Sequence, residues 1–268
     1  MSDKPPAEAF YEPLGDGRFA STPATAGPWS PDFQHGGPVS ALLGRAFERY
    51  EPVSGTRVAR VTVELLSPVP VDVLEIGVRI VRPGKRVTLL EAEMTHGGRP
   101  VARATAWRIM RAPGRLEPVV HEPPPPPLPA TTPPFPKWPG VHADGYLAAM
   151  EWRIVRGTFN KPGPGATWAR SRIPLVPGEP DTPLVRALTL ADSASGIGGQ
   201  LDTAKWLIIN TDLTVALHRD PAGEWLCLDA SLDLSPEGSA LCEATLADAG
   251  GVVGRALQTL LVDDRASS

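Results

Sequence analysis

The two halves of the chain carry the same pattern of apolar and polar residues at a spacing of 152 positions. Residues 58–110 align with residues 210–262 without a gap. Identical pairs include Leu65/Leu217, Leu74/Leu226, Leu89/Leu241, Glu91/Glu243, Ala92/Ala244, Gly98/Gly250, Val101/Val253, Arg103/Arg255 and Ala104/Ala256. A slip of one residue would turn every side chain of a strand to the other face. The preserved alternation of apolar and polar residues is therefore stronger evidence for an internal repeat than the modest sequence identity between the halves. The pattern predicts one folding unit that is present twice.

The sequence of each half predicts one helix followed by strands. In the first half, residues 38–50 predict a helix, and residues 57–110 alternate between apolar and polar positions, as β-strands do. In the second half, residues 182–196 predict an apolar helix, and residues 206–263 again predict strands. Turn signals at Gly97-Gly98 and Gly250-Gly251 separate successive strands, so the sheets should be antiparallel. The fold class is therefore predicted to be α+β, with two tandem helix-plus-antiparallel-sheet repeats.

A proline-rich segment divides the halves. Residues 121–140 read HEPPPPPLPATTPPFPKWPG and hold many of the 32 prolines of the chain. Such a run fixes φ, lacks N–H donors and prefers an extended helix, so it can continue neither a sheet nor an α-helix. We interpret it as a stiff linker, with a docking site for a proline-reading partner as the alternative. The predicted domains are residues 1–119, a linker at residues 120–140, and residues 141–268, with the two sheets packed side by side into one.

Composition excludes several classes of protein. The 26 Lys and Arg residues and 30 Asp and Glu residues give a net charge of −4, which argues against a nucleic-acid partner. Two cysteines are too few for a disulfide scaffold or a four-cysteine zinc site. No apolar run is long enough to cross a bilayer, and the N-terminal residues lack an apolar signal core. We therefore expect a cytoplasmic protein without a membrane partner.

Four short motifs resemble those of a known family. They are FQHGGPVSALL at residues 33–43, LADSASG at residues 190–196, NTDLTVALHR at residues 210–219 and VVGRALQTLL at residues 252–261. In this order and spacing they resemble the double hot-dog acyl-CoA thioesterases of the thioesterase II type, in which a sheet wraps around a helix in each repeat. Residues 213–217, LTVAL, depart from the bulky residues usual in that family, so the resemblance leaves the substrate open.

The resemblance implies a catalytic set of Asp192, Thr211 and Gln258. Thioester hydrolysis needs a positioned water, an acceptor for its proton and donors for the oxyanion. The resemblance gives Asp192 the role of general base, while Gln258 and Thr211 hold the water and the carboxylate. Substrate and oxyanion binding would fall to His35, Gly36 and Gly37, since glycine permits close approach to the backbone N–H groups at a helix start.

The internal repeat supports this set independently of the family. At the shift of 152, the positions equivalent to the catalytic set hold Ser40, Ala59 and Ala106 in the first half. Duplicated units share the needs of their scaffold, so polar side chains found in one copy alone are poorly explained by scaffolding. The comparison predicts one active site per chain, built largely from the second repeat.

Other interpretations stay open from the sequence. An enoyl hydratase or dehydratase of the same fold would need an Asp/His pair, for which His35 is the only candidate, and a non-catalytic acyl-binding protein would need only the cavity. His218 and Arg219 either reach a phosphate group or are solvated at a strand end. We expect no metal and no cofactor, an acyl-CoA or acyl-carrier thioester as the partner, and a homodimer or higher assembly, because sheet edges invite pairing.

Overall fold

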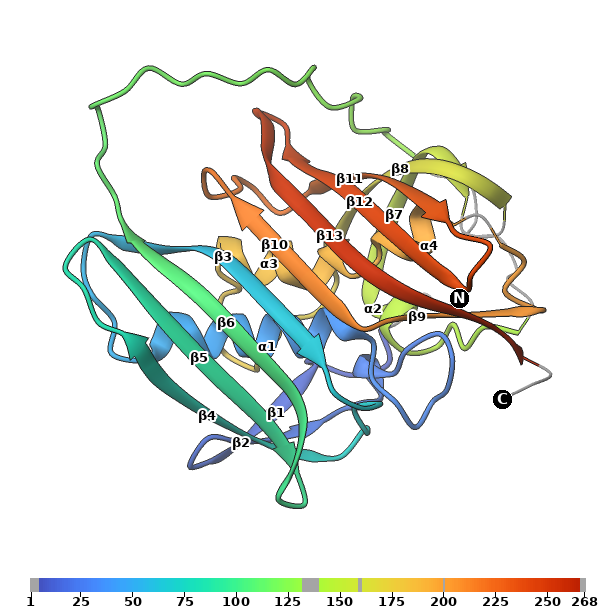
Figure 1. Cartoon of the computed structure of the whole chain (residues 1–268), viewed down its shortest axis with the longest axis horizontal. Helices are drawn as coiled ribbons and strands as arrows, with labels where there is room; N and C mark the ends of the chain where they lie inside the picture. The colour runs from blue at the N-terminus through green and yellow to red at the C-terminus, as the bar shows by residue number, and fades with distance from the viewer. Residues whose placement is uncertain (1–4, 132–139, 159–160, 200, 266–268) are drawn as a thin grey trace.

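The chain forms one antiparallel sheet that runs through both repeats. A computed structural model describes residues 5–131, 140–158, 161–199 and 201–265. Within this part, the strands follow the order β1-β2-β4-β5-β6-β3-β10-β13-β12-β11-β8-β7, and β9 pairs with β13 beside this path. Figure 1 shows the strands of the first repeat and those of the second meeting in the middle of the molecule.

Each repeat contains a β-hairpin, then a long helix and then a run of antiparallel strands, and in the second repeat the short helix α2 precedes the hairpin. The first repeat consists of β1 (Tyr11–Gly15), β2 (Arg18–Ser21), the short 3-10 helix η1 (Pro23–Thr25), α1 (Gly36–Arg49), β3 (Thr56–Leu65), β4 (Val73–Arg82), β5 (Val87–His96) and β6 (Arg99–Met110). The second consists of α2 (Tyr146–Ala149), β7 (Met150–Thr158), β8 (Lys161–Ser171), α3 (Pro183–Ala191), α4 (Ala194–Ile197), β9 (Trp206–Asn210), β10 (Asp212–Leu217), β11 (Leu226–Leu234), β12 (Ser239–Asp248) and β13 (Gly251–Asp264).

The two repeats join through β3 and β10. These strands pair antiparallel, with Thr62 opposite Thr214, and the two hydroxyl oxygens lie 3.0 Å apart. The two threonines are 152 positions apart, the same spacing that relates the repeats, so each residue faces its own counterpart here. Outward from β3 the order is β6, β5, β4, β2 and β1, and outward from β10 the equivalent strands of the second repeat follow as β13, β12, β11, β8 and β7. A pseudo-twofold axis therefore passes through the Thr62–Thr214 pair.

The two long helices pack against each other on one face of the sheet (Figure 1). Glycines in α1 allow a close approach to α3: a Cβ added to Gly37 would lie 2.3 Å from the Thr189 carbonyl oxygen, and one added to Gly44 would lie 2.3 Å from Leu188 Cδ1. Apolar side chains of both helices and of both halves of the sheet form one continuous core. The close crossing brings the start of α1 to the end of α3, which places the site described below.

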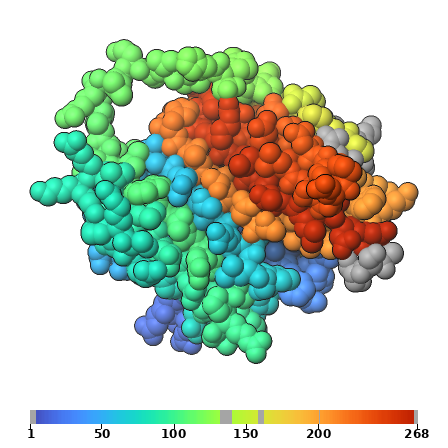
Figure 2. Space-filling model, viewed as in Figure 1, coloured from blue at the N-terminus to red at the C-terminus, as the bar shows by residue number. Residues whose placement is uncertain are grey.

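The proline-rich linker arches from the end of β6 to the second repeat, as the green chain in Figure 2 shows. Its described part is held at backbone carbonyls: Trp168 Nε1 donates to the Pro126 oxygen at 3.0 Å, and the Arg153 guanidinium donates to the Pro129 oxygen at 2.7 Å. Because prolines keep their carbonyl acceptors, this segment binds the repeat without joining the sheet. Residues 132–139 lie outside the described part, and the predicted domain boundaries stay a prediction.

The predicted single sheet is confirmed, and the tandem helix-plus-sheet arrangement is confirmed only in part. Sequence analysis missed the hairpins β1–β2 and β7–β8, in which glycine and proline interrupt the alternation. The helix predicted over residues 182–196 is split into α3 and α4. Within residues 206–263, which predict strands, the chain breaks at Thr211, between β9 and β10. Both breaks occur beside the candidate site. Among the described residues, no helix has the length and apolar character needed to cross a membrane.

Candidate active site

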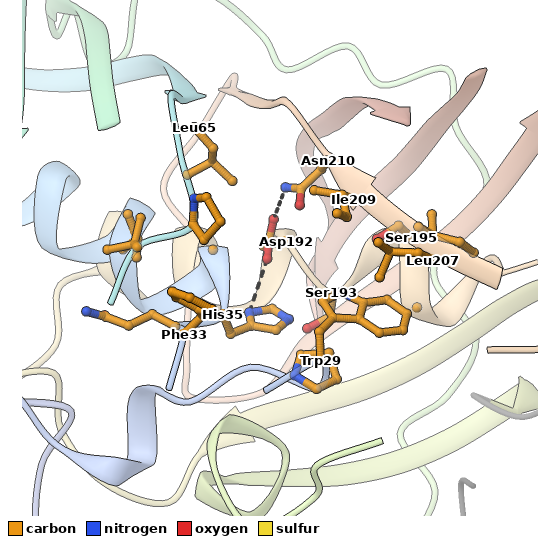
Figure 3. A pocket seen from close by; sticks show the side chains of 18 of the residues that line it. Trp29, Phe33, His35, Leu65, Asp192, Ser193, Ser195, Leu207, Ile209 and Asn210 are labelled. Carbon is orange, nitrogen blue, oxygen red and sulfur yellow. Dashed lines mark hydrogen bonds and ion pairs between the residues drawn. The ribbon is translucent and has the colours of Figure 1, made fainter. Parts of the chain in front are cut away.

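A cavity of about 370 Å³ opens where the start of α1 meets the end of α3 and the β9–β10 break. Apolar side chains form most of its wall, and Figure 3 shows several of them around one carboxylate. They include Trp29, Phe33, Val39, Leu65, Val69, Leu147, Leu201, Leu207, Ile208 and Ile209. Such a wall suits an apolar group with a few polar contacts to fix its orientation.

Asp192 supplies that carboxylate from the C-cap position of α3. Its Oδ1 atom accepts hydrogen bonds from Asn210 Nδ2 at 2.6 Å and from Gln258 Nε2 at 3.0 Å. Its Oδ2 atom lies 3.1 Å from His35 Nδ1, and only 5% of the Asp192 side chain is exposed. In Figure 3 the carboxylate lies between His35 and Asn210. The first repeat therefore supplies one neighbour of Asp192, and the second repeat supplies two.

Gln258 lies behind the cavity wall and contacts Asp192 from there. It is fully buried in β13 and is not among the described residues that line the cavity. Besides donating to the Asp192 carboxylate, its Nε2 lies 3.3 Å from the Asp192 carbonyl oxygen, and its Oε1 accepts from the Ser195 N–H at 3.2 Å. These bonds satisfy polar backbone groups where the helix breaks between α3 and α4. The Gln258 amide thus fixes both the carboxylate and the chain that carries it.

Thr211 lies on the cavity wall, but its hydroxyl points to the backbone. Its Oγ1 donates to the Thr259 carbonyl oxygen at 3.2 Å and also lies 3.3 Å from Asp212 Oδ1. The contacts of the described residues include no hydrogen bond between Thr211 and Asp192. The neighbouring residue, Asn210, makes that contact instead, and sequence analysis missed it. The repeat contained the signal, since at the shift of 152 Asn210 stands opposite Val58, an apolar residue.

The start of α1 brings backbone N–H groups to the site. His35 is the N-cap, and its Nδ1 lies 3.0 Å from the Gly37 nitrogen. Gly36 lines the cavity, whereas Gly37 does not and instead packs against α3. Pro38 has no N–H, and the contacts of the described residues give the Gly36 N–H no partner. Of the two predicted oxyanion donors, Gly36 is therefore the one that lines the cavity.

His35 is held by an aromatic ring beneath it. The imidazole stacks on Tyr146 with 3.8 Å between ring centroids and 11° between planes. The Tyr146 hydroxyl lies 2.8 Å from both the Thr189 carbonyl oxygen and Ser193 Oγ, so α3 and the residue after Asp192 fix the tyrosine. Burial lowers the pKa of His35 below its ordinary value of 6.5, and the nearby Asp192 charge opposes this shift. The imidazole is therefore neutral at neutral pH.

His218 and Arg219 lie at the other end of β10. The Arg219 guanidinium donates to both carboxylate oxygens of Asp248 at 2.6 Å, and His218 contacts neither the cavity nor Asp192. Arg219 thus has a structural partner, and the phosphate-binding alternative gains no support from this arrangement.

Comparison with known proteins identifies the family. Residues 25–109 match the acyl-CoA thioesterase N-terminal domain, and residues 121–262, more than half of the chain, match the acyl-CoA thioesterase C-terminal domain. The chain belongs to the acyl-CoA thioesterase family. It is accordingly a thioester hydrolase. No curated protein sequence gives a significant match.

Solved structures of similar proteins confirm the hot-dog fold. A protein from Novosphingobium aromaticivorans is 22% identical, with a TM-score of 0.75, over 94% of this chain and 98% of that one. A hot-dog protein of unknown function from Alicyclobacillus acidocaldarius is 18% identical, with a TM-score of 0.73, over 94% and 95% of the two chains. An acyl-CoA thioesterase II from Mycobacterium marinum is 17% identical, with a TM-score of 0.65, over 96% of both chains. At this identity the likeness shows the fold, and the roles of residues rest on the geometry.

Replacing Gly36 tests how closely the carboxylate packs on α1. A Cβ on Gly36 would lie 2.8 Å from both Asp192 carboxylate oxygens, too close for any real contact. We expect Gly36→Ala to displace the carboxylate and to lower kcat by at least about tenfold, since a misplacement of 1 Å can cost about 100-fold. Gly77→Ala in β4, where an added Cβ meets nothing within 4 Å, is the matched control. Equal turnover of the two variants in steady-state assays would contradict this placement.

Proposed function

We propose that the thioester hydrolysed by this enzyme is an acyl-CoA, and that the Asp192 carboxylate is the group on which activation of the water depends. The supporting observation is the position of this carboxylate inside a largely apolar cavity, at the N-terminal end of α1. The acyl chain would lie along the apolar wall. The thioester carbonyl would lie between Asp192 and the Gly36 N–H, which donates to the oxyanion.

The neighbours of Asp192 divide the remaining tasks. Asn210 and Gln258 both donate to Oδ1, so they fix the rotation of the carboxylate and leave Oδ2 directed toward His35 and the cavity. Gln258 is therefore proposed as a positioning residue. Thr211 lies at the cavity wall, where its oxygen retains a lone pair for a water molecule. These assignments keep the predicted set of Asp192, Thr211 and Gln258 and add Asn210 to it.

The experiment that tests this function is a hydrolysis assay over a series of acyl-CoA chain lengths. We expect release of free coenzyme A from at least one member of the series, with unchanged rates in excess EDTA, because the reaction as proposed uses no metal. Among the described residues, no group of three His, Cys, Asp or Glu side chains is placed to hold a metal ion. Saturable binding of acyl-CoA without turnover would instead support the non-catalytic alternative. Restoration of lost activity by a divalent metal would refute the metal-free mechanism.

A second candidate activity gains one observation. Sequence analysis left His35 as the only candidate for the Asp/His pair of an enoyl-CoA hydratase, and in the fold His35 Nδ1 lies 3.1 Å from Asp192 Oδ2 at the cavity. The same preparation should therefore be assayed for hydration of trans-2-enoyl-CoA. Hydration that is faster than hydrolysis of the matching saturated thioester would favour this alternative.

A further inference from the structure

The cavity extends to two sides of the Asp192 carboxylate. In Figure 3, Leu65 lies on one side of it and Trp29 on the other. Thr203 and Leu207 line the same cavity together with Trp29. A thioester also has two arms, the acyl chain on its carbon and the thiol chain on its sulfur, and they leave the reacting group in opposite directions. Each arm therefore needs a side of its own.

A guanidinium lies at the Trp29 end of this cavity. Arg265 follows β13, and its Cζ atom lies 5.1 Å from the centroid of the Trp29 ring. The face of an indole ring attracts a cation, and stacking leaves the N–H groups at the edge of the guanidinium free to bind a ligand. A Cβ added to Gly140 would lie 3.3 Å from Arg265 Nη1 and 3.8 Å from the Thr203 carbonyl oxygen, so the guanidinium also lies near this lining residue.

Arg265 has no acceptor within the described part of the chain. Its Nε atom is buried there without a hydrogen-bond partner, and its Nη atoms form neither a hydrogen bond nor an ion pair with a described residue. The Nη atoms are not among the polar atoms buried without a partner, so solvent reaches them. Arg108, by contrast, donates to three backbone carbonyls, and Arg45 donates to the Glu179 carboxylate. Contacts within the described chain therefore do not explain why a guanidinium is placed beside the cavity.

A second cation lies beside Arg265. The Arg265 N–H donates to the Lys205 carbonyl oxygen at 3.0 Å, which extends the ladder between β9 and β13 by one pair. Lys205 is exposed. Asp202, Asp263 and Asp264 are neighbours in the chain, yet no ion pair among the described residues includes either cation. Like charges directly opposite each other on neighbouring strands are destabilising, so the sheet gains nothing from this pair.

The separation between Asp192 and the two cations fits one part of an acyl-CoA. Asn210, which donates to the Asp192 carboxylate, follows Lys205 by five residues. A strand rises about 3.3 Å per residue, so these two residues lie about 17 Å apart along β9. About a dozen bonds separate the thioester sulfur of an acyl-CoA from its diphosphate, and an extended chain gains about 3.5 Å per three bonds, so this arm spans about 14 Å. The long side chains of Lys205 and Arg265 cover the difference.

We propose that Arg265 and Lys205 bind the diphosphate of coenzyme A, with the pantetheine arm along the Trp29 side of the cavity. The proposal rests on the proposed acyl-CoA hydrolysis and adds the residues that distinguish an acyl-CoA from the thioester of a short thiol. The edge of the Arg265 guanidinium is a fork that fits phosphate oxygens, and Lys205 supplies a point charge beside it. The side of Leu65 then remains for the acyl chain.

Calorimetry with free coenzyme A tests this site without any turnover. We expect coenzyme A to bind the full chain about 100-fold more tightly than pantetheine, which lacks the phosphates. Arg265→Gln should weaken coenzyme A about tenfold or more, since a hydrogen bond to a charged group is worth at least this factor, and should leave pantetheine unchanged. Arg265→Lys should restore part of the loss, because it returns the charge without the fork. Dephospho-coenzyme A keeps the diphosphate and should respond to Arg265→Gln as coenzyme A does.

Arg99→Gln is the matched control for the loss of one positive charge. Arg99 is exposed at the start of β6 and does not line the cavity, so this variant should bind coenzyme A as the wild type does. Equal affinity of Arg265→Gln and Arg99→Gln for coenzyme A would overturn the proposal, as would a wild type that binds pantetheine as tightly as coenzyme A. An effect of Arg265→Gln that is absent with dephospho-coenzyme A would overturn the assignment to the diphosphate.

Kinetics separate this binding role from a role in the fold. In Arg265→Gln we expect KM for an acyl-CoA to rise about tenfold or more at unchanged kcat, because the contact lies far from the reacting atoms and is the same in the ground and transition states. The matching acyl-pantetheine should be hydrolysed equally by variant and wild type. A loss of kcat on both substrates would show a structural role instead. The calorimetric result stands even if no acyl-CoA is hydrolysed, so failure of the proposed function is distinguishable from failure of this inference.

Discussion

Asp192→Asn is expected to lower kcat by about 10²–10⁴-fold while changing KM little, because it keeps the shape of the side chain and removes its charge. The amide cannot act as a base as the carboxylate does. Its one oxygen can accept from Asn210 and Gln258, and its NH2 group then lies where the carboxylate Oδ2 faces His35. Steady-state hydrolysis of the best acyl-CoA measures the effect, and an unchanged melting temperature shows that the fold is intact.

The fold itself supplies a control for this substitution. Glu48, near the end of α1, accepts a hydrogen bond at 2.6 Å from Thr182, the N-cap of α3. It thus stands toward α3 as Asp192 stands toward α1, but it does not line the cavity. Glu48→Gln keeps an acceptor for Thr182 and should keep wild-type turnover. If Asp192→Asn hydrolyses thioesters as fast as Glu48→Gln does, Asp192 has no part in the chemistry.

Asp248→Ala is expected to lower the free energy of unfolding by about 3 kcal/mol, the low end for breaking a buried ion pair. Asp248 is fully buried, and its carboxylate accepts both nitrogens of Arg219 and the N–H groups of Ala222 and Gly250, at 2.6–2.8 Å. Alanine removes the carboxylate that pairs with the guanidinium, which keeps only backbone carbonyl acceptors such as that of Gly251, and it leaves two backbone donors without an acceptor. Denaturant unfolding of both proteins measures the loss.

The pH dependence of this effect has a definite sign. Burial alone would raise the pKa of Asp248, but the hydrogen bonds from Arg219, Ala222 and Gly250 outweigh it and hold the pKa below its ordinary value. The stabilisation is therefore complete above the unfolded-state pKa of about 4 and is lost as the pH falls through the folded-state value. The exposed Asp229–Arg156 pair is the control, and Asp229→Asn should cost no more than about 1 kcal/mol. Equal losses for the two sites would show that burial does not set the strength of the Asp248 contact.

Local patterns predicted the strands and helices that have a regular period. The shift of 152 places β5 on β12 and β6 on β13 without a gap, and the structure starts these strands at positions with that same spacing. Thr182 is the N-cap of α3, and Pro183 follows it in the first turn, where proline is favoured. The hairpins before the long helices escaped prediction. In β8, for example, two glycines and two prolines interrupt the pattern, and the strand is held in the sheet by pairing with β11. Such pairing is a long-range property that a local pattern does not report.

Sequence analysis named individual residues of the candidate site only where they belong to one of the four family-like motifs. The structure brings Gln258 and Gly36 against Asp192. Thr211 does not reach Asp192 among the contacts of the described residues, and the residue before it, Asn210, donates to the Asp192 carboxylate instead. In a strand, neighbouring residues point to opposite sides, so a shift of one position changes which side chain reaches the carboxylate. The break between β9 and β10 determines this choice, and it arises from pairing with β13 and β3.

The sequence by itself determined the repeat, the single sheet and the polar residues that the second repeat has and the first lacks. The strands follow from the alternation of apolar and polar residues with a period of two. The repeat and the differences between its copies follow from comparing positions 152 residues apart. Only the tertiary structure decided that His35 of the first repeat meets Asp192 of the second. Their contact depends on the close crossing of α1 and α3, where Gly37 and Gly44 let the helices approach. Two residues separated by 157 positions have no local signal in common, so their distance is set by packing alone.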